Sequence, residues 1–275
     1  MRTEDFEFLA RLLKQRSGLM LTQDKVYLLE SRLTPVARQR GLASLEDLVA
    51  KLRTNRDEAL VNEVTEAMTT NESFFFRDNT PFDLFREKVM PAMEKRRKDR
   101  KLRIWCAAAS TGQEPYSLAM ILQENKVKWG GWDIEIIGTD LSAQVLDKAK
   151  RGHYSQFEVQ RGLPIQMLIK YFNQEGEVWQ LSDEIRRMVK FREFNLLDNF
   201  FSLGRFDIVF CRNVLIYFDQ PTKGDVLGRM ANTLATDGSL FLGAAETVLG
   251  ITDKFRPVRG CRGLYAQSSA PEDAF

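Results

Sequence analysis

The spacing of apolar residues changes along this chain, and the change predicts two different architectures. Between residues 3 and 68, apolar side chains such as Phe6, Leu9 and Leu13 recur every three to four positions, which is the period of an amphipathic helix. From residue 102 onward, short strand-like runs alternate with helical stretches. Such alternation indicates parallel strands joined by crossover helices. The sequence therefore predicts an all-α N-terminal domain followed by an α/β domain with a doubly wound sheet.

Turn signals divide the chain further. Residues 1–68 contain apolar-periodic stretches that end at glycines, which predicts a bundle of about four helices. The irregular stretch TTNESFFFRDNTPF, residues 69–82, predicts a linker whose phenylalanines pack in the core or in a lid. Residues 83–275 form the predicted α/β domain. Within it, segment 169–191 departs from the alternation with two strand-like runs around a Glu-Gly turn, so we expect a small antiparallel β insertion there.

Composition and charge exclude several classes of protein. Hydrophobic residues make up 44% and charged residues 28%, as in ordinary globular proteins. The sequence shows neither an apolar run of about 18 residues nor the apolar core of a signal peptide, so we expect a cytoplasmic protein without membrane insertion. The net charge of +2 argues against a polyanion binder. Residues 11–40 nevertheless carry seven basic against two acidic side chains, which predicts either a solvated helix face or a docking surface for an acidic partner.

Cysteine and histidine usage argues against a metal centre. Cys106, Cys211 and Cys261 lie far apart in apolar runs, so we expect them to be reduced and buried. His153 is the single histidine, so a Ser-His-Asp triad would have to include it. Its place after a predicted helix favours a surface or capping role over catalysis.

Polar residues follow the predicted strands at the edge of the sheet where doubly wound folds bind ligands. The first strand leads into AAASTGQEPYS, residues 107–117, which contains neither Gly-x-Gly-x-x-Gly nor the Gly-Lys-Ser of a phosphate loop. Glu114 in this loop would repel a phosphate but would suit the ammonium or sulfonium of a zwitterionic ligand. Asp140 ends the second strand, where a carboxylate can accept both hydroxyls of a ribose.

Two further strand ends complete the pattern. Asn195 and Leu196 follow the third strand, where an amide can bond an adenine edge and a leucine can pack on the ring. Arg212 and Asn213 follow the fourth strand. In this order the residues describe an adenosine site without a phosphate cradle, and S-adenosylmethionine fits that description.

Four blocks of the sequence resemble the chemotaxis receptor methyltransferases of the CheR family. They are NESFFFR (71–77), STGQEPYS (110–117), GTDLS (138–142) and CRNVLIYF (211–218). The first and last are the more specific, and the resemblance runs through nearly the whole chain. It implies a Rossmann-like S-adenosylmethionine-dependent methyltransferase domain with a small antiparallel β subdomain. It also implies an all-α receptor-docking domain in front and a linker that covers the cofactor.

The resemblance implies a reaction and a site as well. The expected activity is methyl transfer from S-adenosylmethionine to glutamate side chains of chemotaxis receptors, with S-adenosylhomocysteine as product and without a metal. Arg77 and Tyr217 are then the catalytic candidates, with Tyr217 beside the methyl group. Whether Arg77 would hold the carboxylate of the cofactor or that of the substrate stays open. The implied cofactor-binding residues are Asn71, Ser73, Arg77, Glu114, Asp140, Asn195, Leu196, Arg212 and Asn213.

The expected partner is the cytoplasmic helical region of chemotaxis receptors. Its methylation helices carry glutamates beside the target residue, so the basic stretch with Arg32, Arg38 and Arg40 is the candidate docking face. Whether the 169–191 insertion also grips a receptor's C-terminal tail peptide stays open. A glutamate carboxylate, with a reference pKa of about 4.3, is ionised at neutral pH, so its attack on a methyl group needs no general base.

Two rival functions fit parts of the sequence. The basic helices permit a nucleic-acid methyltransferase of similar fold. The near-zero net charge and the lack of interleaved aromatic and basic residues argue against it and against a nucleic-acid partner. The second rival is a non-catalytic protein that only senses the cofactor. The joint presence of Arg77, Asp140, Asn213 and Tyr217 argues against decay of the site.

Overall fold

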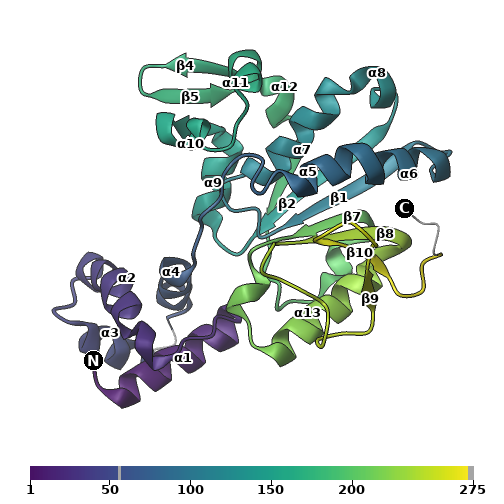
Figure 1. Ribbon diagram of the computed structural model, residues 1–275. Coiled ribbons are helices and arrows are strands. Elements are labelled where there is room, and N and C mark those ends of the chain that lie inside the picture. The colour runs from purple at the N-terminus through teal and green to yellow at the C-terminus, as the bar shows by residue number, and fades with distance from the viewer. Residues whose placement is uncertain (55–56, 272–275) are drawn as a thin grey trace. The chain divides into compact units, whose positions relative to one another are not determined.

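The computed structural model describes residues 1–54 and 57–271 (Figure 1). The chain divides into two compact units. The N-terminal unit comprises Met1–Thr70 together with Tyr217–Thr222, and the α/β unit comprises Asn71–Ile216 together with Lys223–Phe275. Each unit has its own buried apolar core.

The N-terminal unit is helical, as the apolar period predicts. Leu9, Leu13 and Leu29 are fully buried in its core. Ser44 and Asp47 exchange backbone-to-side-chain hydrogen bonds of 3.1 Å, which caps a helix start. The elements are α1 (Thr3–Ser17), the 3-10 turn η1 (Gln23–Lys25), α2 (Val26–Gln39), α3 (Leu45–Thr54) and α4 (Glu58–Met68).

A seven-stranded sheet forms the centre of the α/β unit, in the order β6-β2-β1-β7-β8-β10-β9. The strands from β6 to β8 pair in parallel, and β10 pairs antiparallel with β8 and β9. This confirms the predicted doubly wound sheet, and the strand order reverses between β1 and β7. The strands are β1 (Lys101–Ala107), β2 (Asp133–Asp140), β6 (Val189–Glu193), β7 (Phe206–Cys211), β8 (Leu234–Leu242), β9 (Phe255–Pro257) and β10 (Leu264–Gln267).

Helices cover both faces of this sheet because its crossovers run in opposite directions. Helix α7 connects β1 to β2, and α13 connects β7 to β8, so right-handed crossovers place them on opposite faces (Figure 1). Strand β1 lies between them, and its Ile104, Trp105 and Cys106 are fully buried. The helical elements between residues 80 and 233, apart from those beside the small sheet, are α5 (Thr80–Leu84), the π-helical η2 (Phe85–Val89), α6 (Met90–Arg96), α7 (Gln113–Glu124), α8 (Lys126–Trp129), α9 (Ala143–Arg151), the 3-10 turns η3 (Phe200–Leu203) and η4 (Leu215–Tyr217), and α13 (Gln220–Thr233).

A second, three-stranded antiparallel sheet has the order β3-β5-β4. Its β4–β5 hairpin lies inside the predicted insertion 169–191, but its third strand, β3, lies outside it. The end of that segment instead belongs to β6 of the large sheet. Strand β3 has only three residues, which is too short for an alternating pattern to stand out. The elements of this subdomain are β3 (His153–Ser155), α10 (Gln156–Gln160), α11 (Ile165–Tyr171), β4 (Phe172–Glu175), β5 (Val178–Leu181) and α12 (Asp183–Arg186).

The three cysteines are buried in the core, and the single histidine lies at the surface. Cys106, Cys211 and Cys261 are buried and unpaired, as predicted. His153 is exposed in β3 opposite Gln180, so it lies at the surface in a strand. Across the described ranges, no helix combines the length and the apolar character that crossing a membrane requires.

Candidate active site

The loop after β1 is strained and tightly packed. Between Ala107 and the start of α7, the backbone takes left-handed conformations at Ala108 (φ 60°), Ser110 (φ 50°) and Gly112 (φ 92°). A Cβ on Gly112 would lie 2.9 Å from the ring of Tyr116, so no larger residue fits without movement. Left-handed non-glycine residues persist only where their surroundings hold them, and they gather at ligand sites.

Asp140, the last residue of β2, ties this loop to the next one. Its carboxylate is buried and accepts hydrogen bonds from the backbone N–H groups of Ser110 (2.8 Å) and Ser142 (3.0 Å). A carboxylate has about four acceptor positions, so such an aspartate can hold loops and accept ligand hydroxyls together. Asp140 therefore lies at the carboxyl end of β2, as the sequence predicts, and its role toward a ribose stays a prediction.

Arg212 joins three segments at the end of β7. Its guanidinium, only 1% exposed, donates to Glu114 (2.8 Å), to the carboxylate of Asp78 (2.7 Å) and to the carbonyl of Arg77 (2.8 Å). Its Nε has no hydrogen-bond partner in the described part of the chain. A buried donor without a partner is rare and marks a position that a ligand or water can complete.

Glu114 lies at the N-terminal end of α7 with its carboxylate almost fully buried. Burial raises the pKa of Glu114, and the neighbouring Arg212 guanidinium acts in the opposite direction. The ion pair and the positive end of the helix dipole both favour the ionised form. The sequence-predicted candidates Glu114, Asp140 and Arg212 thus surround the carboxyl ends of β1, β2 and β7.

The segment predicted as a linker packs along the α/β unit from Asn71 onward. The Asn71 carbonyl accepts a hydrogen bond from Ser110 Oγ (2.8 Å), which joins this segment to the loop after β1. The backbone N–H of Phe76 donates to Ser117 Oγ (3.0 Å). Phe75 is fully buried, with its ring centroid 5.0 Å from that of Tyr154 in the small sheet. Ser73, between these contacts, is half-buried.

Arg77 ends this segment, and its guanidinium contacts neighbouring residues of the chain. Its guanidinium donates to the carbonyl of Glu72 (2.8 Å) and lies 5.4 Å from the centre of the Phe74 ring. Arg161 lies over the same ring at 4.2 Å and forms a 2.6 Å ion pair with Glu72. Arg77 is half-buried, and its backbone carbonyl accepts a hydrogen bond from Arg212. Within the described residues, its guanidinium is not paired with a carboxylate.

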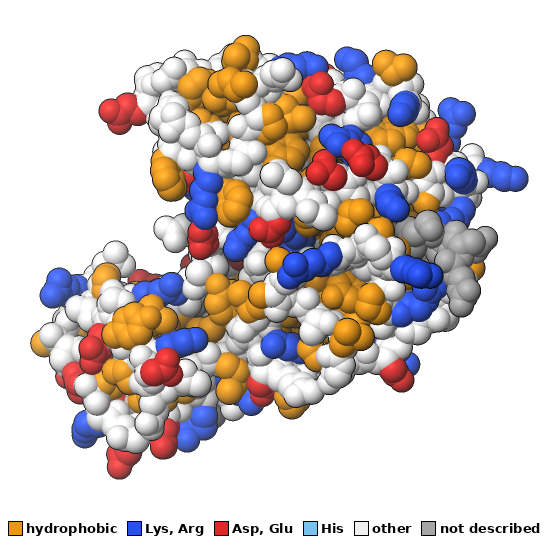
Figure 2. Space-filling model, in the orientation of Figure 1, with side chains coloured by type: hydrophobic (Ala, Val, Ile, Leu, Met, Phe, Trp, Pro, Cys, Tyr) orange, Lys and Arg blue, Asp and Glu red, His pale blue; other side chains and the backbone are white. Residues whose placement is uncertain are grey.

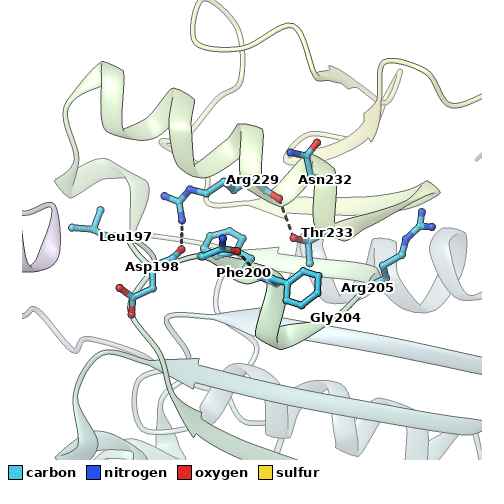
Figure 3. A pocket seen from close by; sticks show the side chains of 10 residues that line it. Leu197, Asp198, Phe200, Gly204, Arg205, Arg229, Asn232 and Thr233 are labelled. Carbon is cyan, nitrogen blue, oxygen red and sulfur yellow. Dashed lines mark hydrogen bonds between the residues drawn. The ribbon is translucent and has the colours of Figure 1, made fainter.

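Asn195 and Leu196 lie in the turn after β6. The Asn195 side chain accepts from the N–H of Leu197 (3.0 Å), and Leu196 is buried. A hollow of about 560 Å³ begins directly beyond them at Leu197 and is lined by residues of η3 and α13 (Figure 3). Arg229 of α13 donates to the carbonyl of Asp198 and so supports this turn from the side of the hollow. The hollow is lined by none of the predicted site residues.

Asn213 takes a left-handed conformation (φ 59°), and its N–H donates to Glu246 (2.8 Å). Sequence reasoning missed Glu246, which lies in the turn after β8 and is buried. A glutamate three residues after Gly243, which follows the apolar run Leu240–Leu242 at the end of β8, was the available signal. Fully buried glutamates are rare unless they are paired or hydrogen-bonded.

The remaining candidates belong to the N-terminal unit. Tyr217 groups with its helices, and the Tyr217 carbonyl accepts from the N–H of Met20 (2.9 Å). Arg32 donates to the carbonyls of Met68 (2.8 Å) and Thr69 (2.9 Å), so it caps the C-terminus of α4.

The two other docking candidates differ from Arg32 and from each other. Arg40 pairs with Glu63 at 2.7 Å, whereas Arg38 is exposed and has no side-chain partner in the described ranges. On the face drawn in Figure 2, acidic and basic side chains are interspersed over the N-terminal helices. The three arginines therefore do not form one uniform basic patch.

These geometries fit an adenosine ligand with a positively charged group. Asp140 can accept ribose hydroxyls, the buried Glu114 carboxylate suits a cation, and Arg212 Nε offers a donor. Within the described residues, no cluster of three or more His, Cys, Asp or Glu side chains could hold a metal ion.

Comparison with known proteins identifies the family. The profile of the CheR methyltransferase all-alpha domain matches residues 4–69, and that of the CheR methyltransferase SAM binding domain matches residues 71–264. Chemotaxis protein methyltransferase Cher2 of Pseudomonas putida is 41% identical, over 96% of this chain and 98% of that protein. Chemotaxis protein methyltransferase 1 of Pseudomonas aeruginosa is 42% identical, over 94% of this chain and 96% of that protein. The chemotaxis protein methyltransferase of Salmonella typhimurium is 34% identical, over 96% of this chain and 90% of that protein. The chain therefore belongs to the CheR family of S-adenosylmethionine-dependent chemotaxis methyltransferases.

Proposed function

We propose that this chain methylates glutamate side chains of chemotaxis receptors in the cytoplasm, with S-adenosylmethionine as methyl donor. The observation that carries the proposal is the polar cluster of Glu114, Asp140 and Arg212 at the carboxyl ends of β1, β2 and β7. It lies inside the segment that matches the SAM binding domain of the family.

The reaction needs alignment more than acid–base chemistry. When bound, S-adenosylmethionine supplies an electrophilic methyl group: a glutamate oxygen bonds to the methyl carbon as the carbon–sulfur bond breaks, the bonding pair stays on sulfur, and no proton moves. Opposite charges cancel along this path, so strong solvation would favour the reactants. The protein's contribution is therefore orientation and exclusion of water, which together supply up to about 7–11 kcal/mol in well-oriented reactions.

Each site residue receives a role under this proposal. Glu114 faces the ammonium group of the cofactor, and Asp140 accepts the ribose hydroxyls. Asn195 and Leu196 bind the adenine. The remaining cofactor contacts, at the methionine end and along the site wall, come from Asn71, Ser73, Arg77, Arg212 and Asn213.

Two residues act closest to the chemistry. The Arg77 guanidinium, whose contacts are a backbone carbonyl and a ring face, is the candidate to hold a carboxylate by paired hydrogen bonds. Tyr217 is the candidate to orient the substrate through its hydroxyl.

The N-terminal helical domain, residues 1–68, is the proposed receptor-docking part, and Arg38 is its most available basic side chain. The partner is the helical, glutamate-bearing cytoplasmic region of a receptor. The small sheet is the candidate site for a receptor's C-terminal tail peptide.

The test is a transfer assay with methyl-labelled S-adenosylmethionine. Purified protein is incubated with receptor-containing membranes, with the same membranes stripped of receptors, and with total RNA. We expect label on the receptor that mild base releases as methanol, since the bond is an ester. Base-stable label on RNA would favour the nucleic-acid alternative and overturn the proposal.

A further inference from the structure

Glu246 collects backbone N–H groups from two loops. Its Oε2 accepts from Gly243 (2.7 Å) and Asn213 (2.8 Å), and its Oε1 accepts from Val214 (2.9 Å) and Ile216 (3.3 Å). The Glu246 N–H in turn donates to the Gly243 carbonyl at 3.0 Å. One buried carboxylate thus fastens the loop after β7 to the loop after β8.

The arrangement leaves little room for adjustment. A Cβ on Gly243 would lie 2.8 Å from Glu246 Oε2 and 2.9 Å from the backbone nitrogen of Asn213. Hydrogen bonds from N–H groups to a carboxylate are stronger than those to a neutral acceptor. Replacing this carboxylate would leave several backbone donors of a packed turn without acceptors.

Asn213 is the residue that needs such support. Its φ of 59° lies in the left-handed region, which asparagine tolerates better than most residues with a Cβ but which is still less favourable than a right-handed conformation unless contacts stabilise it. Its N–H bond to Glu246 fixes the backbone on one side, and the Val214 bond fixes it on the other. The direction of the Asn213 side chain is set by this conformation.

We propose that Glu246 is a positioning residue for cofactor binding. Its carboxylate holds the backbone of Asn213 in the left-handed conformation and thereby directs the Asn213 side chain to the cofactor. The inference rests on the proposed cofactor role of Asn213 and adds a residue that does not itself touch the ligand.

The first experiment needs no cofactor. Amide hydrogen exchange is compared between the wild type, Glu246→Gln and a control, Glu135→Gln. Glutamine has nearly the same shape as glutamate, but it replaces one acceptor oxygen by an NH₂ group. That group cannot accept hydrogen bonds from the backbone N–H groups that face it. Glu135 is likewise a hydrogen-bonded glutamate, but its partners are the side chains of Arg103 and Lys190, and it lies near the start of β2, at the opposite end of that strand from Asp140.

In Glu246→Gln we expect the amides of Asn213, Val214 and Gly243 to exchange at least about tenfold faster, while amides in the centre of β1 keep their protection. The control should change none of them. Unchanged protection at these loop amides overturns the proposal. If the glutamine variant does not fold, Glu246→Asp, which keeps the charge but has a shorter reach, is judged by the same criteria.

The second experiment distinguishes positioning from a purely structural role. S-adenosylhomocysteine affinity is measured by calorimetry for Glu246→Gln in the wild-type background and in Asn213→Gly. Glycine takes the left-handed conformation without strain and removes only the side chain that is to be directed.

We expect Glu246→Gln to weaken binding by at least about tenfold in the wild type and by much less in Asn213→Gly, because coupled residues are not additive. The same fold loss in both backgrounds overturns the inference. A wild type that fails to bind S-adenosylhomocysteine would instead contradict the proposed function, and the exchange experiment would still decide the role of Glu246 in the loop.

Discussion

Two opposing influences act on the proton of Glu114. Burial raises its pKa, while the guanidinium of Arg212 at 2.8 Å favours the ionised form. The net direction is upward, so protonation on acidification begins at a higher pH than for an ordinary glutamate. In the proposed function only the ionised form attracts the ammonium group of the cofactor.

Affinity for S-adenosylhomocysteine should therefore fall as the pH falls, beginning above the ordinary glutamate range. Binding should also release protons there, because the complex keeps Glu114 ionised. Calorimetry at several pH values, in two buffers of different ionisation enthalpy, measures both effects. Glu114→Gln should bind weakly at every pH and lose the slope. An unchanged slope in that variant would assign the titration to another group.

Arg77 is the residue proposed to hold a carboxylate close to the reacting atoms. Arg77→Ala removes one hydrogen bond to a backbone carbonyl and a contact with the Phe74 ring, so the fold should survive. Turnover should fall at least about tenfold, which corresponds to about 1.4 kcal/mol of the barrier. Arg86→Ala, which removes a surface arginine paired with Asp83 and Glu87, is the matched control. Near-normal turnover of Arg77→Ala in the methyl-transfer assay would refute its role.

For single residues, the sequence predicts where a side chain lies in the fold better than it predicts its hydrogen-bond partners. Glu114, Asp140 and Arg212 could be placed together because the carboxyl ends of parallel strands meet at one edge of a sheet. Their contacts depend on loop conformations that no periodic pattern records. Arg32 shows the consequence: its charge suggests docking, yet its side chain caps α4. Glu246 is the opposite case: no motif in the sequence marks it as a site residue, yet its carboxylate accepts hydrogen bonds from backbone N–H groups of another loop.

At the scale of elements, the turn between α10 and α11 holds the 71–77 segment in place. Gly162 has a φ of 81°, and a Cβ there would lie 2.1 Å from the Phe75 carbonyl oxygen. Gly176, in the β4–β5 hairpin, has a similar φ of 63° with nothing within 4 Å. Both glycines have a positive φ that strains any residue with a Cβ. Of the two, Gly162 is the one where an added Cβ would also clash with a neighbouring backbone atom.

Gly162→Ala should therefore destabilise the protein by about 1–3 kcal/mol more than Gly176→Ala, the range expected for overpacking. It should also weaken S-adenosylhomocysteine binding, because the displaced segment carries Asn71, Ser73 and Arg77. Urea unfolding and calorimetry on both variants measure the two effects. Equal losses of stability would show that the segment is not held by this turn.

The elements that the sequence predicts best are the long ones with a clear period. The four helices at the start and the central strands of the large sheet lie where the apolar spacing indicates. Strands β3 and β9 have three residues each, and a run of that length carries no recognisable alternation. The course of residues 71–79 along the α/β unit could not be predicted from the sequence either, since it depends on single contacts such as that of Phe75 with Tyr154.

At the scale of the whole molecule, a net charge of +2 conceals a basic stretch in the N-terminal helices. The arginines of this stretch differ in whether their side chains are already bonded: Arg32 caps a helix, Arg40 is paired with Glu63, and Arg38 is exposed. A reversal of charge at Arg32 would therefore mix a docking effect with a loss of helix capping. Arg38 is the cleaner probe of receptor docking.

Arg38→Glu should weaken receptor methylation several-fold while leaving S-adenosylhomocysteine affinity and thermal stability unchanged, because opposed charges steer association and like charges suppress it. Lys51→Glu on α3, which reverses the same charge outside the basic stretch, is the control. The effect should shrink with added salt. If both variants methylate receptors as the wild type does, the basic stretch is a solvated helix face.

The most direct test of the account is a calorimetric titration of the purified protein with S-adenosylhomocysteine. We predict binding at a single site, a large loss of affinity in Asp140→Asn, and unchanged affinity in Asp147→Asn, which alters an exposed aspartate of α9. The account would be contradicted by a wild type that gives no binding heat, or by an Asp140→Asn variant that binds as tightly as the wild type.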